Sequence, residues 1–162
     1  TGAGIVHEHF PKALSMNHEN SHQEANRQVR ILLMQTVALS AVFALISWVT
    51  LPCLLSWIGN PIYQQFAHWY PWLLLAMAIN AISMVPHFAL YARGADKPII
   101  YSHIAALIGF AVVTWLSGPA LGATAILTGL NTAFVIILFW KGFAYLGLIY
   151  KEKYQKEIPV HA

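Results

Sequence analysis

The stretch between Arg30 and Arg93 contains no Lys, Arg, Asp or Glu, and it limits the possible folds more than any other feature. It is too long for a single membrane crossing, which takes about 20 apolar residues. Gly59, Asn60 and Pro61 lie within it and favour a turn, because these residues break helices. Only 9% of the whole chain is charged, against about 25% in ordinary soluble domains. The sequence therefore predicts an integral membrane protein.

Four apolar segments follow one another, separated by turns that contain Gly, Pro or charged residues. They must be helices, because lipid offers no partner to backbone N–H and C=O groups. We expect turns at residues 58–61, 93–98 and 117–119, and helices over residues 31–57, 66–92, 98–117 and 120–150. The predicted fold class is an all-α polytopic membrane helix bundle with four transmembrane helices. It divides the chain into a polar, amphipathic lead-in (1–30), a four-helix transmembrane region (31–150) and a charged, frayed tail (151–162).

The basic residues predict the orientation of the chain. In a four-span arrangement all nine fall on one side of the bilayer: Lys12, Arg27, Arg30, Arg93, Lys97, Lys141, Lys151, Lys153 and Lys156. The positive-inside rule makes that side cytoplasmic. We therefore expect a multi-pass protein of the bacterial cytoplasmic membrane with both termini in the cytoplasm. Membrane lipids rather than nucleic acid are the expected partners of these residues, with Arg93 and Lys97 as candidates for binding anionic headgroups.

Three of the predicted spans carry polar residues along one helical face. The sets are Thr36, Ser40, Ser47 and Thr50; Asn80, Ser83, His87 and Tyr91; and Thr124, Thr128 and Asn131. Such stripes either pack helices together or line a hydrated path, and the sequence leaves both interpretations open. In the second interpretation Asn80, His87 and Asn131 line the path, and Pro86 bends the helix beside it.

Lys141 has two interpretations that depend on where the last span ends. If the span ends at Trp140, Lys141 is an interfacial residue whose ammonium reaches toward water. If the span continues to Tyr150, Lys141 lies about 14 Å inside the boundary at about 1.5 Å per residue. It then needs an anionic partner such as a phosphate, and it joins Asn80, His87 and Asn131 as a candidate for the substrate path.

Metal binding and catalysis are not expected. Four histidines near the start of the chain share no single helical face and favour a solvated cytoplasmic segment: His7, His9, His18 and His22. Asp96 is the only acidic residue between Glu24 and Glu152, so the spans lack the paired carboxylates of general acid–base chemistry. We expect no enzyme activity and no cofactor.

The order of short motifs along the chain resembles the C-terminal part of a polysaccharide or lipid-linked oligosaccharide flippase of the MOP superfamily, whose relatives include the MATE exporters. Residues 10–15 (FPKALS) are similar to the P-x-x-S that ends a helix in these proteins, and residues 59–63 (GNPIY) to a G-x-x-Y element. Residues 89–94 (ALYARG), followed by Lys97, are similar to the turn A-L-x-A-x-G-(R/K), and residues 118–123 (GPALGA) to the opening of a later helix.

This resemblance implies part of a transporter in which two helical bundles face a central cavity and work by alternating access. The implied substrate is a lipid-linked sugar, and the implied partners are the remaining helices of a larger transporter or a second subunit. Relatives often carry Arg or Lys in the cavity to meet a pyrophosphate, whereas these spans offer only Lys141. The alternatives are a non-transporting membrane scaffold or assembly subunit, and a MATE-type multidrug exporter, which would need an intramembrane carboxylate for coupling.

Overall fold

The structure of the chain is a computed structural model that describes the backbone of residues 5–157 and the side chains of residues 24–154. It contains α1 (Ile5–Ile58), α2 (Pro61–Gln65), η1 (Ala67–Trp69), α3 (Tyr70–Tyr91), α4 (Asp96–Leu121) and α5 (Thr124–Glu157). No strand occurs within residues 5–157. Four segments in this range are long and apolar enough to cross a membrane: Glu24–Ile58, Ala67–Tyr91, Asp96–Leu121 and Thr124–Tyr154. The predicted all-α fold with four spans is confirmed.

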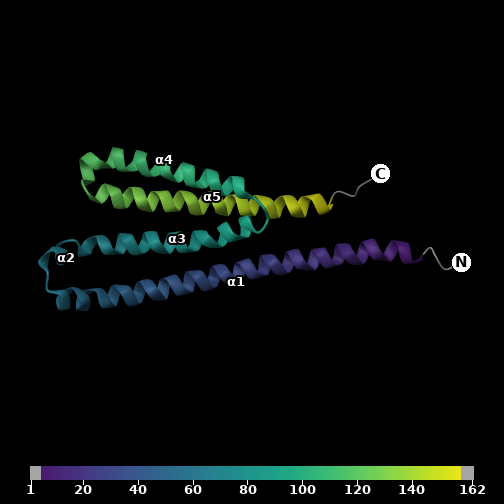
Figure 1. Cartoon of the computed structure of the whole chain (residues 1–162), viewed down its shortest axis with the longest axis horizontal. Coiled ribbons are helices and arrows are strands. Elements are labelled where there is room, and N and C mark those ends of the chain that lie inside the picture. The colour runs from purple at the N-terminus through teal and green to yellow at the C-terminus, as the bar shows by residue number, and fades with distance from the viewer. Residues whose placement is uncertain (1–4, 158–162) are drawn as a thin grey trace.

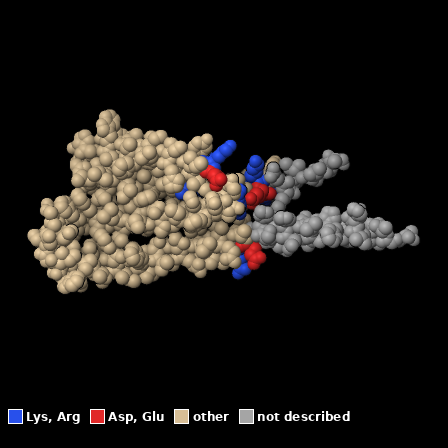
Figure 2. All heavy atoms as spheres, in the orientation of Figure 1, with Lys and Arg blue, Asp and Glu red and all other residues tan. Residues whose placement is uncertain are grey.

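The long helices run up and down, and α5 lies between α4 and α3 (Figure 1). α4 and α5 pack most extensively, α3 packs against α5, and α1 lies at the edge of the group and packs mainly against α3. The start of α1 and the end of α5 lie at the same end of the bundle (Figure 1). Apart from Lys141, the described charged side chains also gather at that end, which we call the charged end (Figure 2).

Two of the three predicted turns lie where the sequence places them. Gly59 and Asn60 separate α1 from α2, and the Asn60 side chain accepts a hydrogen bond from the backbone N–H of Ile62 at 3.1 Å. Gly94 lies in the turn between α3 and α4 with a φ of 66°. This left-handed conformation favours glycine because it has no Cβ.

The third turn was predicted at residues 117–119, and this is wrong. α4 continues through Pro119 to Leu121, and α5 begins at Thr124. A proline near the end of a helix removes one ladder hydrogen bond but need not stop the last turn. Gly122 ends the helix instead, with a φ of 55° and a ψ of −131°, a combination that other residues avoid.

The boundaries expected at residues 30 and 150 do not interrupt the helices. α1 is already helical from Ile5, through the FPKALS motif that was expected to end a helix, and α5 continues through Lys151 to Glu157 rather than fraying there. The change from polar to apolar residues alters what surrounds a helix without breaking it. Residues 23–30 and 151–157 are rich in Ala, Glu, Gln, Lys and Arg, which are good helix formers.

Two hydroxyl groups of the polar stripes bond to the backbone of their own helix. Ser83 donates to the backbone carbonyl of Asn80 at 2.7 Å, and Thr128 donates to that of Thr124 at 3.2 Å. In α1, Thr36, Ser40 and Ser47 are less exposed than their neighbours. For these residues the structure supports the packing interpretation, in which small polar residues allow helices to approach each other.

Gly129 marks a close approach of α5 to α4. A Cβ at this position would meet the Thr114 hydroxyl and would lie 3.1 Å from the backbone carbonyl oxygen of Phe110. Gly147, on the same helix, has nothing within 4 Å of such a Cβ. We expect Gly129→Leu to lower the free energy of unfolding by about 1–3 kcal/mol, because overpacking forces the two helices apart. Gly147→Leu is the matched control and should leave the unfolding midpoint in detergent nearly unchanged; equal midpoints for the two variants would contradict this packing.

Candidate functional site

A lysine buried between two histidines is the most unusual feature of the bundle. Lys141 lies near the middle of the candidate span Thr124–Tyr154, and its exposed fraction is 0%. Its Nζ lies 3.1 Å from Nδ1 of His87 on α3 and 3.3 Å from Nε2 of His103 on α4. Three helices thus each contribute one nitrogen base to what we call the Lys–His cluster (Lys141, His87 and His103).

The two hairpins bring these residues to one depth. Ala95 in the α3–α4 turn is eight residues from His87 and eight from His103. Gly122 in the α4–α5 turn is nineteen residues from both His103 and Lys141. Because antiparallel helices rise equally per residue, positions equidistant from a turn lie at similar depths. This symmetry is a signal in the sequence for His103, which belongs to none of the polar stripes.

The hydrogen-bond chemistry of the cluster is restrictive. An ammonium has three N–H donors and no acceptor, whereas a neutral imidazole has one donor and one acceptor nitrogen. The cluster is therefore satisfied when Lys141 donates to both ring nitrogens and both histidines are neutral. Within the described part of the chain the one ion pair joins Arg93 to Glu152, so the charge of Lys141 has no carboxylate partner there.

The cluster is open on one side. Lys141 is buried and His87 is half-buried, but His103 is exposed on α4. An unshared positive charge in a low-dielectric region attracts anions strongly. His103 is the most exposed member of the cluster, and its ring is in contact with the buried Lys141.

The ammonium of Lys141 does not extend to the membrane–water interface, so the interpretation of Lys141 as an interfacial residue is wrong. α5 continues well beyond Trp140, and the whole side chain of Lys141 is enclosed. The alternative placed it deep in the span beside an anionic partner. Lys141 does lie well inside the candidate span Thr124–Tyr154, but the protein groups beside it are imidazoles rather than anions.

The other two path candidates lie apart from the cluster. Asn131 is buried, and its Nδ2 donates to the carbonyl of Trp72 on α3 at 3.1 Å and to that of Leu127 at 2.9 Å. It therefore ties α5 to α3, although its Oδ1 is buried without a partner in the described part of the chain. Asn80 is half-buried, and its backbone carbonyl accepts the Ser83 hydroxyl. The structure thus brings His87 and Lys141 together, but not Asn80 or Asn131.

The two headgroup candidates have different environments at the charged end. Arg93 donates to Glu152 at 3.3 Å and to the side-chain oxygen of Asn26 at 2.7 Å, and its guanidinium lies 5.0 Å from the centre of the Tyr145 ring. These contacts join α1, α5 and the end of α3. Lys97 is exposed near the start of α4. Arg93 is therefore engaged in helix packing, and Lys97 is the more accessible cation.

The early histidines (His7, His9, His18 and His22) lie outside the residues whose side chains the structure describes. Among the described side chains, no group of three or more His, Cys, Asp or Glu residues is placed to hold a metal ion.

Comparisons of the chain with protein-family profiles, with curated proteins and with solved structures gave no match. The resemblance to the flippases therefore depends on the order of the sequence motifs alone. The site must be interpreted from its own chemistry.

Proposed function

We propose that this chain is a module of a transporter that moves a lipid-linked oligosaccharide across the bacterial cytoplasmic membrane by alternating access. The observation that carries the proposal is Lys141, a fully buried lysine inside a span with two imidazoles and no carboxylate beside it. Ionisable residues inside membrane spans are costly and usually mark substrate or ion pathways. The orientation in the proposal has the charged end and both termini in the cytoplasm.

The chemistry of the cluster suits a pyrophosphate. Phosphate oxygens are acceptors with negative charge, and charge-assisted hydrogen bonds to them are about twice as strong as neutral ones. Lys141 supplies the charge, and each imidazole can turn an N–H toward an oxygen when the anion replaces it as a partner of the lysine. The resemblance to the flippases suggests that this anion is the pyrophosphate of a lipid-linked sugar.

The exposure of the site supports the proposal that further helices complete it. His103 lies on the surface of this four-helix unit, so a path that passes it needs a wall on its other side. The remaining helices of a larger transporter, or a second subunit, would supply that wall. Membrane lipids would cover the apolar faces that stay outside.

A non-transporting scaffold is the second candidate, and a specific observation favours it. The Ser83 and Thr128 hydroxyls bond to their own helices, and Asn131 ties α5 to α3, so part of the polar surface serves packing. A scaffold needs no hydrated space beside α3, whereas a transporter does.

Cysteine labelling separates the two candidates. In a Cys53→Ala background, single cysteines at Asn80 and His87 are expected to react with a water-soluble maleimide in membranes. Phe88 is 64% exposed on the outside of the bundle and serves as the lipid-facing control, where a cysteine should stay unreactive. Failure of both test positions to react from either side of the membrane would favour the scaffold.

A further inference from the structure

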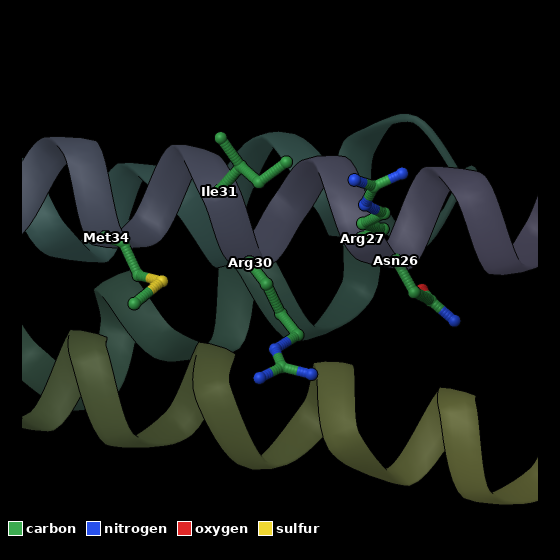
Figure 3. A pocket seen from close by; sticks show the side chains of 5 residues that line it. All are labelled: Asn26, Arg27, Arg30, Ile31 and Met34. Carbon is green, nitrogen blue, oxygen red and sulfur yellow. The ribbon is translucent and has the colours of Figure 1, made fainter.

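The first described turns of α1 carry two arginines that line one cavity. This cavity has a volume of about 440 Å³ and is lined by Asn26, Arg27, Arg30, Ile31 and Met34. In Figure 3 the side chain of Arg30 extends from α1 toward α5. Ile31 and Met34 continue the wall toward the apolar part of the span. The cavity is therefore cationic at the charged end and apolar beyond it.

A second cavity, of about 270 Å³, begins at the same arginine. It lies between α1, α3 and α5, and Arg30 is its only charged lining residue. Apolar groups make up most of the rest, including Leu33, Pro86 and Leu146. α1 packs mainly against α3, and its contacts with α5 are few, which leaves this crevice between the three helices. Arg30 lines both cavities, and we call the pair the slot, with a cationic mouth at the first cavity and an apolar interior in the second.

We propose that this slot binds an anionic phospholipid of the bilayer, with its phosphate at the Arg30 guanidinium, the rest of its headgroup on the side of Arg27, and one acyl chain in the crevice. Guanidinium groups bind phosphate with two parallel hydrogen bonds and keep their charge at any physiological pH. The arginines lie near the start of the candidate span Glu24–Ile58, the level at which lipid headgroups are found. A free phosphate ion would fill the mouth but would leave the apolar crevice empty.

The lipid would also add to the contacts that hold α1 against the rest of the bundle. Contacts between α1 and α3 leave a further cavity of about 350 Å³, lined by residues such as Ser40 and Met77. A lipid that bridges α1 and α5 through Arg30 would fill space that the side chains leave open. This inference does not rest on the transport proposal, because the slot lies on the α1 side of the bundle and none of its lining residues belongs to the Lys–His cluster.

Native mass spectrometry of the purified full chain in mild detergent tests the headgroup contact. The probe is phosphatidylglycerol, with phosphatidylcholine of the same acyl chains as the uncharged comparison. We expect Arg27→Gln and Arg30→Gln each to weaken phosphatidylglycerol binding about fivefold, at about 1 kcal/mol per cation near an anionic lipid. Lys153→Gln removes an exposed cation outside the slot and should have little effect. Equal losses for all three variants would contradict a defined site.

The acyl-chain contact has its own matched pair of variants. Gly142 lines the crevice, and a Cβ there would meet nothing within 4 Å, so Gly142→Leu fills the space without forcing the helices apart. Gly147→Leu adds the same side chain outside the crevice. We expect Gly142→Leu alone to reduce phosphatidylglycerol binding, with both variants melting at the wild-type temperature. Undiminished binding by Gly142→Leu, equally strong binding of phosphatidylcholine, or full competition by inorganic phosphate would overturn the proposal.

Discussion

Lys141→Met should abolish transport while leaving the protein folded. Met has nearly the length of Lys and no charge, so it fills the same enclosed space without needing a partner. Replacing a buried charge with an apolar residue of similar volume is often neutral or stabilising. Loss of the ammonium would remove the one buried cation of the described spans. In cells whose own gene carries the substitution, we expect export of surface polysaccharide to fall by at least about tenfold, which corresponds to about 1.4 kcal/mol.

Two companion variants make this result specific. Lys141→Arg keeps the charge but changes the shape of the donor, so it should retain part of the export. Lys151→Met removes an exposed lysine ten residues further along the same helix and should export normally. Protein levels in the membrane must be equal in all strains. Normal export by Lys141→Met at a normal protein level would remove the cluster from the transport path.

Replacing the histidines should lower the stability of the protein, whereas replacing Lys141 with Met should not. His87→Leu takes away an acceptor at 3.1 Å and leaves a buried ammonium with fewer partners. Breaking a buried polar pair by removing one partner costs more than replacing both, by about 3 kcal/mol or more for a charged group. We therefore expect the double variant His87→Leu with His103→Leu to unfold at a clearly lower temperature than the wild type.

Addition of Lys141→Met to that double variant should restore the melting temperature, because no charge then remains to be satisfied. Thermal unfolding in a single detergent, followed by circular dichroism, measures all the variants on one scale. His87→Leu alone should destabilise more than His103→Leu alone, since His103 is exposed and can be replaced by water. A triple variant that melts as low as the double variant would show that the histidines stabilise the bundle by packing rather than by accepting from Lys141.

The sequence predicts most of this fold because its helix-breaking residues, Gly and Pro, lie close to the turns. The long uncharged run requires spans, and Gly59 and Gly94 lie where the first two turns form. The third turn shows the limit of this reasoning. Pro119 and Gly122 are both breakers, and only backbone geometry decides between them: a proline fits the last turn of α4, whereas the ψ of Gly122 does not fit a helix.

The site could be predicted in part. His87 and Lys141 stand out because ionisable residues are rare in spans. The spacing of polar residues, however, describes one helix and says nothing about its contacts with another. The contact between Lys141 and the histidines depends on how α3, α4 and α5 face one another, which the period of a single helix does not contain. Asn131 illustrates the same point, since its partner is the backbone carbonyl of Trp72 on another helix.

Transbilayer movement of a lipid-linked oligosaccharide in proteoliposomes tests the central claim most directly. The protein should be purified as the native gene encodes it, reconstituted in sealed vesicles, and compared with Lys141→Met at equal density. The proposed function predicts that the wild-type protein moves the labelled lipid-linked pyrophosphate across the bilayer and that the Lys141→Met protein does not. Equal movement by both proteins, or movement by neither above that of protein-free vesicles, would contradict it.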